Sequence, residues 1–209
     1  YERIAKLEVD IEEAYRELAQ TFDYVPTQTF PYILYSSYQE FLQTNLFPMQ
    51  EGVLGVTSPR DLVLTLPYLG DDRLFKEVSS HEMTHQFTIQ KVHDLAAAAQ
   101  LSGDPLDGFP LWFIEGLAEF YAKDGNDPEA EMDIRDLVVN PAPERGFALI
   151  DFFEDRPGSV LWTYKAGHIR CAFLEDEYGA GFLQQLLDSS VQFVQTRDRG
   201  GARGFSQLL

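Results

Sequence analysis

The chain has 209 residues, 44% of them hydrophobic and 13% aromatic, so it can bury a core of its own and is predicted to form one folded domain. Its formal net charge is −18, which argues against nucleic acid and anionic membranes as partners and leaves basic or neutral peptides. No run of 18 apolar residues exists, so membrane insertion is not expected. The single cysteine, Cys171, excludes a disulfide framework and a thiolate metal site.

The first 46 residues predict a helix, a strand and a second helix. Apolar residues recur at helical spacing across residues 2–21, which predicts an amphipathic helix there. The aromatic and β-branched run from Phe30 to Tyr35 is typical of a strand. Ser37 and Glu40 form a capping box, so a short helix is expected to follow Ser37 and to reach Leu46.

Two further strands and a long helix are predicted next. Residues 53–57 and 62–66 read as strands on either side of a Ser-Pro-Arg-Asp turn, and a hairpin is the shortest connection between them. Pro67 cannot donate a hydrogen bond to a neighbouring strand and is expected to end the second one. Asp72 is expected to cap the helix that follows, which should be the most buried element of the domain.

That helix contains the sequence His-Glu-Met-Thr-His. His81 and His85 are four residues apart, so their imidazoles lie one turn apart on the same face and can bind a single metal ion. Many metallopeptidases bind zinc through this pattern. Glu82 lies about 100° further around the helix axis, close to where a bound water would be, and its predicted role is general base. The alternative is a surface helix with two ordinary histidines.

A further helix, predicted to begin at Pro110, offers a third metal ligand. Glu115 and Glu119 share one face of this helix among apolar residues, and two carboxylates in such surroundings need a partner. We expect Glu115 to complete a site for one Zn²⁺ and Glu119 to hydrogen-bond a histidine ligand. The alternative is an amphipathic helix whose glutamates face water.

The rest of the chain is predicted to be mostly helical. Residues 94–110 form a connector, after which helical patterns appear at 134–139, 147–153, 160–177 and 182–193. In the charge-rich insertion 124–136, four residues offer calcium ligands, but a solvated loop is favoured because the spacing lacks the glycine of an EF-hand loop. These four are Asp124, Asn126, Asp127 and Glu129.

The motifs resemble those of the gluzincin metallopeptidases, in particular the bacterial peptidase-MA-like group related to aminopeptidase N. The resemblance lies in His-Glu-Met-Thr-His, in the segment 112–119 and in the Tyr-x-x-Gly segment that starts at Tyr164, and it extends over roughly residues 30–190. Two departures are present. Ile114 replaces the usual Asn, and the spacing from His85 to Glu115 is 29 residues (115 − 85 − 1), which is longer than in aminopeptidases.

The resemblance implies an α+β, thermolysin-like catalytic domain. Residues 1–209 would form a single metallopeptidase domain, in which a lobe of residues 1–95 with a small mixed β-sheet, helices and the metal helix precedes a mostly α-helical lobe of residues 96–209, with the zinc site between them. In gluzincins the strand just before the metal helix lines the cleft. Leu64 and Thr65 are therefore expected to bind an extended substrate as an added strand at an edge of the sheet; an ordinary interior strand is the alternative.

The resemblance also assigns roles outside the metal ligands. Tyr164 is expected to donate a hydrogen bond to the carbonyl oxygen as negative charge develops on it, with His168 one turn later as the reserve candidate. Glu119 is expected to orient His81. Independently of the resemblance, His93 is expected to be structural, near the end of the metal helix, because a lone histidine is more often structural than catalytic.

The predicted function is a zinc-dependent metallopeptidase that uses an activated water, with Glu82 as the base. Aminopeptidase relatives hold the free amino group of the substrate with an acid in a Gly-x-Met-Glu-Asn segment. Residues 51–57 have no glutamate after the glycines, so endopeptidase activity is slightly favoured over aminopeptidase activity. Two more functions fit the same residues: a zinc-stabilised, non-catalytic interaction domain and a zinc hydrolase of non-peptide bonds.

Family resemblance further implies an extracellular or periplasmic protein. The first residues, Tyr1 to Arg3, resemble neither a signal peptide nor a native start. The strand that normally precedes the first helix of a gluzincin sheet is missing as well. We therefore expect a trimmed N-terminus and further domains in the intact protein.

Overall fold

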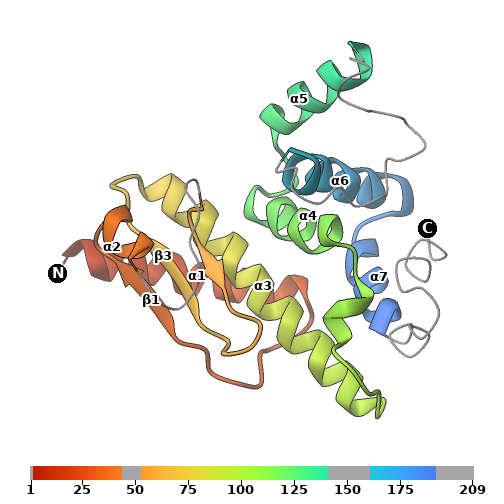
Figure 1. Cartoon of the computed structure of the whole chain (residues 1–209), viewed down its shortest axis with the longest axis horizontal. Helices are drawn as coiled ribbons and strands as arrows, with labels where there is room; N and C mark the ends of the chain where they lie inside the picture. Colours follow the sequence, from red (N-terminus) through yellow and green to blue (C-terminus); the bar gives the residue numbers. More distant parts are fainter. Residues whose placement is uncertain (1, 44–52, 141–160, 192–209) are drawn as a thin grey trace. The chain divides into compact units, whose positions relative to one another are not determined.

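The computed structural model describes residues 2–43, 53–140 and 161–191, and these form a mostly helical fold with one three-stranded mixed sheet (Figure 1). The predicted α+β class is confirmed. The chain divides into two compact units, residues 1–91 and 92–209, and the division falls inside one helix, α3 (Asp72–Ala98). In the described stretches, no helix has both the length and the apolar character needed to cross a membrane.

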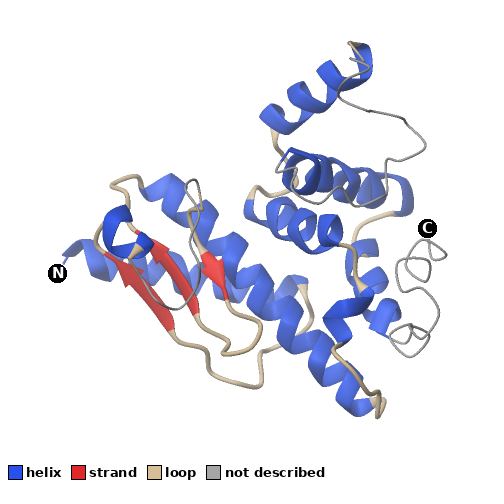
Figure 2. Ribbon diagram, in the orientation of Figure 1, coloured by secondary structure: helices blue, strands red, loops and turns tan. Residues whose placement is uncertain are grey.

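The first unit contains the sheet, whose strands Figure 2 shows in red. The strand order is β1-β3-β2, with β3 parallel to β1 and antiparallel to β2, so β3 is the central strand and the predicted hairpin of β2 and β3 is confirmed. The elements that precede α3 are α1 (Glu2–Thr21), β1 (Tyr32–Tyr35), α2 (Tyr38–Leu42), β2 (Val56–Thr57) and β3 (Leu64–Pro67).

Local backbone geometry explains where these elements differ from the predicted bounds. β3 begins at Leu64 rather than at Leu62, because Leu62 has a φ of 53°, a left-handed conformation that cannot continue a strand. The Ser37 cap is confirmed, since its hydroxyl accepts a hydrogen bond from the Glu40 N–H at 3.2 Å. The reciprocal bond of a capping box is not formed, because the Glu40 carboxylate accepts from the Ser36 hydroxyl at 2.6 Å. α2 ends already at Leu42. Pro67 is the last residue of β3, as predicted.

The start of α3 differs from prediction by one residue. Asp71, not Asp72, caps the helix: its Oδ1 accepts hydrogen bonds from the N–H groups of Arg73 at 2.9 Å and Leu74 at 3.1 Å. Asp72 instead accepts a hydrogen bond from the Tyr68 hydroxyl at 2.7 Å and pairs with a lysine of α1. The cap residue therefore lies in the loop before the helix, and the side chain of Asp72, the first helical residue, links α3 to α1.

The core of the first unit forms where α3 packs against α1 and the sheet (Figure 1). The ring of Phe87 lies 5.1 Å from that of Tyr15 and 5.6 Å from that of Phe22, both on or next to α1. On the sheet side, Tyr32 of β1 and Ser79 of α3 share a hydrogen bond of 2.7 Å between their hydroxyls. These contacts bury α3 along most of its length.

The second unit is helical, as predicted. Its described elements after α3 are a 3₁₀ turn η1 (Pro105–Gly108), α4 (Leu111–Ala122), α5 (Pro128–Val139), a π-helical turn η4 (Leu161–Lys165), α6 (Ala166–Tyr178) and α7 (Phe182–Ser190). The predicted helices at 134–139, 160–177 and 182–193 correspond to parts of α5, η4 with α6, and α7. The predicted helix at 147–153 lies outside the described residues.

The insertion 124–136 is mainly a helix rather than the favoured solvated loop. Asp127 caps α5 by accepting the Ala130 N–H at 3.0 Å, and Pro128 occupies the first helical turn, where its missing N–H is not needed. An aspartate followed by a proline is a helix-start signal that sequence reasoning missed here. In the described part of the unit, α5 packs on η4 and α6 through a small apolar cluster of Ile134, Leu137, Trp162, Ala166 and Ile169.

Candidate metal centre

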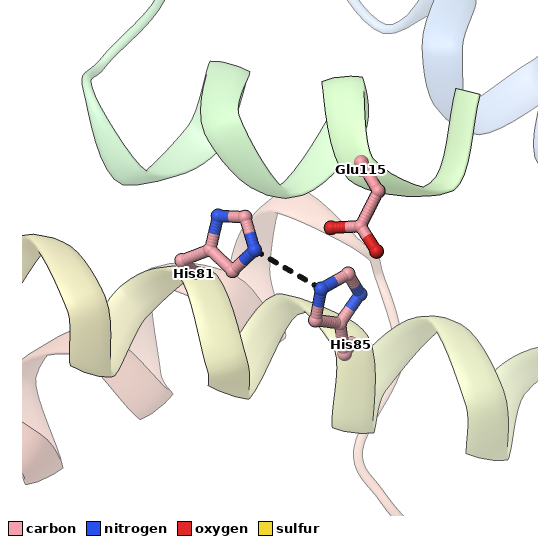
Figure 3. A group of neighbouring side chains, drawn as sticks. All are labelled: His81, His85 and Glu115. Atoms are coloured by element: carbon pink, nitrogen blue, oxygen red, sulfur yellow. Dashed lines mark hydrogen bonds between the residues drawn. The ribbon is translucent and has the colours of Figure 1, made fainter. Parts of the chain in front are cut away.

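His81 and His85 of α3 lie as the motif predicts. Their Nε2 atoms face each other at 3.1 Å, and their ring planes are 82° apart (Figure 3). Two nitrogens bound to one tetrahedral zinc ion, each about 2.05 Å from it, would be about 3.3 Å apart. The imidazole pair is therefore already close to the arrangement that a single zinc ion requires.

Glu115 of α4 belongs to the same group. One ligand atom from each of His81, His85 and Glu115 lies within 4.8 Å of the other two, and Figure 3 draws the three side chains. Two imidazoles and one carboxylate are a donor set that fits zinc and leaves a fourth coordination position for water or substrate. Within the three described stretches, this is the group of His, Cys, Asp and Glu side chains that could hold a metal ion.

Glu82 lies next to this histidine pair and is 5% exposed. Its Oε2 accepts a hydrogen bond from the Thr57 hydroxyl at 2.8 Å, and the same hydroxyl lies 3.0 Å from the Glu82 carbonyl oxygen. On the other side, the carboxylate packs against the backbone at Gly55. Glu82 is thus a buried acid whose carboxylate is oriented by the segment that contains β2.

The prediction that Leu64 and Thr65 lie at an edge of the sheet is wrong. Both residues are in β3, which has β1 on one side and β2 on the other, and both are fully buried. A substrate strand needs unpaired backbone groups, and those of β3 are used within the sheet. In the described part of the sheet, β2 is the edge strand nearest to Glu82.

A small cavity with mostly apolar walls lies in the same unit. It is lined by Leu54, Pro67, Leu69, Asp71, Leu74, Phe75 and Val78. Val78 is one helical turn before Glu82, and both side chains approach Gly55. An apolar side chain of a ligand bound along residues 54–57 would therefore lie near both this cavity and Glu82.

In the second unit, two glycines bring α4 and α6 close together. A Cβ added at Gly116 would lie 2.5 Å from the carbonyl carbon of Gly167, and one added at Gly167 would lie 2.7 Å from the Trp112 carbonyl oxygen. Neither position has room for a side chain. Gly116 follows Glu115, and Gly167 follows Tyr164 by three residues, so the close crossing fixes these two predicted site residues relative to each other.

Tyr164 is half-buried in the π-helical turn η4. Its neighbour Lys165 bridges two acids of α5, with Nζ 2.9 Å from Glu129 and 3.0 Å from Asp133. Single π-helical turns are frequent at functional sites because they redirect one side chain of a helix. The turn is thus held by α5 on one side and by the glycine crossing on the other.

Comparisons with known proteins found no relative of this chain. No family model, curated protein or solved structure matches the chain. The gluzincin resemblance stays a prediction, carried by the motif residues and by the geometry of His81, His85 and Glu115.

Glu119 has a partner that sequence reasoning missed. Its Oε2 lies 2.6 Å from the Nζ of Lys123, which also lies 2.6 Å from Asp127, so one lysine joins the end of α4 to the cap of α5. The hydrogen bond that Glu119 is expected to accept from a histidine ligand stays a prediction. The spacing of four from Glu119 to Lys123, at the end of one predicted helix, is the sequence signal for the first of these ion pairs.

The same ion pairs bear on the calcium site considered for residues 124–129. The carboxylates of Asp127 and Glu129 pair with Lys123 and Lys165. Burial raises the pKa of Asp127, but the Lys123 ammonium and the Ala130 N–H outweigh it, so the net pKa lies below the ordinary value. Asp127 is an ionised helix cap, and its charge is matched by a lysine rather than by a metal.

His168 does not suit the reserve role of a substrate-facing donor. It is 1% exposed, its ring lies 5.8 Å from that of Phe120, and it hydrogen-bonds the backbone of Glu119. Burial lowers its pKa, although the nearby Asp127 opposes this. His168 is a neutral core histidine, the commoner situation for a lone histidine on a buried helix face. His93, as predicted, is near the end of α3, where it lies 3.9 Å from Asp104.

Proposed function

We propose that this chain is a zinc-dependent metallopeptidase of the gluzincin type with a thermolysin-like catalytic domain. The observation that supports it most is the grouping of His81, His85 and Glu115 beside the buried acid Glu82. Three protein ligands bind zinc without help from Glu82. Burying a carboxylate next to the metal ligands costs free energy. The role of general base, which a hydrolase needs, would account for an acid at this position.

Zinc held by the three ligands would lower the pKa of a water molecule and polarise the scissile carbonyl. Glu82 would take one proton from the attacking water and deliver it to the leaving nitrogen, so the carboxylate ends the cycle in its starting form. Tyr164 would donate its phenolic hydrogen to the carbonyl oxygen as negative charge develops there.

The proposed substrate is a peptide bound in extended form. It would lie along the segment that contains β2, since that segment orients Glu82, with an apolar side chain of the peptide near Val78 and Leu54. The net charge of −18 favours basic or neutral peptides. No acid follows the glycines of residues 51–57, so cleavage inside a peptide is slightly favoured over removal of its first residue.

The test combines zinc analysis with turnover on a mixed peptide library. We expect about one zinc per chain and cleavage that is lost in Glu82→Gln, since this variant keeps the ligands and removes the base. Glu77→Gln is the matched control, because Glu77 is on the same helix but pairs with Arg73 at 2.7 Å. Zinc without turnover would favour the non-catalytic interaction domain, and turnover on esters alone would favour another hydrolase. Sub-stoichiometric zinc after refilling would exclude the proposed site.

The site of cleavage needs a separate comparison. One peptide is assayed with a free and with an acetylated N-terminus under the same conditions. Equal cleavage is expected for an endopeptidase. If acetylation stops cleavage, an acid outside residues 51–57 binds the amino group, and the chain acts as an aminopeptidase.

A further inference from the structure

We propose that Thr57 and Gly55 form a clamp that fixes the carboxylate of Glu82, with Thr57 as a positioning residue. The catalytic consequence depends on the proposed function, whereas the clamp itself depends only on contacts within the first unit. Neither residue was singled out by its sequence, because the segment Leu-Gly-Val-Thr resembles an ordinary strand.

The hydroxyl of Thr57 can donate to either of two oxygens of the same residue. It lies 2.8 Å from the carboxylate Oε2 of Glu82 and 3.0 Å from the Glu82 carbonyl oxygen. A hydrogen bond to an ionised carboxylate is roughly twice as strong as one between neutral groups, so the Oε2 contact is the stronger of the two. Either contact holds Thr57 against α3 at Glu82.

The position of the hydroxyl is itself well determined. Thr57 pairs with Leu64 in the antiparallel ladder of β2 and β3. The next residue, Ser58, donates its N–H to the Val63 carbonyl at 2.9 Å, and its hydroxyl accepts the Asp61 N–H at 3.1 Å. Because threonine is β-branched, its χ1 angle has few alternatives once the backbone is fixed. The hairpin of β2 and β3 therefore holds the Thr57 hydroxyl in a fixed position.

Gly55 forms the other side of the clamp. Two residues before Thr57, it lies on the same face of the extended segment. A Cβ at this position would lie 2.7 Å from both Cγ and Oε1 of Glu82 and 2.9 Å from a methyl of Val78. Its φ is outside the left-handed region, so glycine is needed here for space and not for backbone conformation. Any larger residue would occupy the volume that the carboxylate now fills.

The two contacts together restrict a side chain that has three rotatable bonds. A glutamate without them would sample several rotamers, and only a few of these would hold an oxygen within reach of a water at the metal. With Oε2 engaged by Thr57, the carboxylate plane is set and Oε1 stays available to accept a proton. The clamp therefore prepares the base before substrate arrives.

Steady-state kinetics of Thr57→Val and Thr57→Ser test the catalytic consequence. Valine has nearly the same shape but lacks the hydroxyl, so kcat is expected to fall on the order of 10- to 100-fold with KM and zinc content unchanged. Serine keeps the hydroxyl and should restore kcat to within about 3-fold of the original rate. A valine variant with the original kcat would overturn the positioning role while leaving the peptidase proposal intact.

The clamp is tested independently by thermal unfolding of the metal-free protein. Thr57→Val and Gly55→Ala are each made in the original chain and in a Glu82→Ala background. Each is expected to lower Tm by a few degrees in the original chain and by clearly less once the carboxylate is absent. Equal shifts in both backgrounds would show that neither residue is coupled to Glu82. Because this measurement needs no substrate and no zinc, it decides the clamp even if no peptide is cleaved.

Discussion

Gly116→Ala should disturb the crossing that holds Glu115 and Tyr164 in register. The new Cβ would lie 2.5, 2.6 and 2.7 Å from the carbonyl carbon, carbonyl oxygen and Cα of Gly167. These are backbone atoms, so no side-chain rotation relieves the overlap. α4 and α6 would have to separate by about 1 Å to restore normal contact distances of about 3.5 Å.

The expected change in the free energy of unfolding of Gly116→Ala follows from two opposing effects. In an isolated helix, replacing glycine by alanine stabilises by about 1 kcal/mol. Overpacking a tight contact costs roughly 1–3 kcal/mol and more where backbone must move. Because the overlap here is with backbone atoms, the upper part of this range, about 2–3 kcal/mol, applies, and the net loss is about 1–2 kcal/mol. This corresponds to a Tm lower by about 2–8 °C in a domain of this size. The shift of η4 should also reduce kcat on the order of 10²-fold, the usual effect of a 1 Å misplacement.

Thermal unfolding of Gly116→Ala, of Gly167→Ala and of the double variant provides the assay. Once the helices have separated for one methyl group, the second should fit at little further cost, so the double variant should lose less than the sum of the two single losses. A Tm equal to or above that of the original protein for Gly116→Ala would refute the close contact. Strict additivity of the two substitutions would refute the shared crossing.

Three further outcomes are expected. Tyr164→Phe should lower kcat on the order of 10²-fold with zinc content unchanged, because a hydrogen-bond donor to the transition state is lost while the metal ligands stay; kinetics and elemental analysis measure this. Arg170→Lys should destabilise the protein by about 1–2 kcal/mol in urea unfolding, since the planar guanidinium lies 4.9 Å from the ring of Trp112 and 4.6 Å from that of Trp162, and an ammonium cannot stack on both. Chelation should remove zinc and turnover together, and added zinc should restore both.

Features set by nearby residues could be predicted from the sequence. The spacing of apolar residues predicted α1 and α3, and the Ser37 cap was predicted because its partner is three residues away. The histidine pair belongs to the same class, since a separation of four on a helix fixes both imidazoles on one face. In each case, the decisive interaction lies within one helical turn.

Features set by distant pairings could not be predicted in this way. The central place of β3 depends on its parallel pairing with β1, about 30 residues earlier, and nothing in the sequence of β3 itself distinguishes an edge strand from a central one. The roles of Gly55 and Thr57 depend on their approach to α3, and the burial of His168 depends on its packing against α4. The sequence therefore indicates the candidate metal ligands and the candidate base but not the residues that orient them.

The burial of His168 has a measurable consequence below neutral pH. Burial lowers its pKa from the ordinary value of 6.5, against the opposing influence of Asp127 and of the hydrogen bond to the Glu119 backbone. The folded protein therefore binds this proton less readily than the unfolded chain. The stabilisation is fully present above pH 6.5 and is lost as pH falls through the pKa of the folded state, by up to about 1.4 kcal/mol per pH unit.

His168→Gln should remove this contribution to the pH dependence, because a glutamine does not titrate and can still hydrogen-bond the Glu119 backbone. The measurement is the free energy of urea unfolding of the metal-free protein between pH 7.5 and 5, where the original chain should lose stability more steeply than the variant. His93→Gln is the matched control, since His93 is an exposed histidine beside Asp104. Parallel pH profiles for the original chain and for His168→Gln would mean that the folded protein accommodates a charged imidazole at this position. In that case Asp127 would serve as its counter-ion, and the ion pairs that join α4 to α5 would include a histidine as well as Lys123.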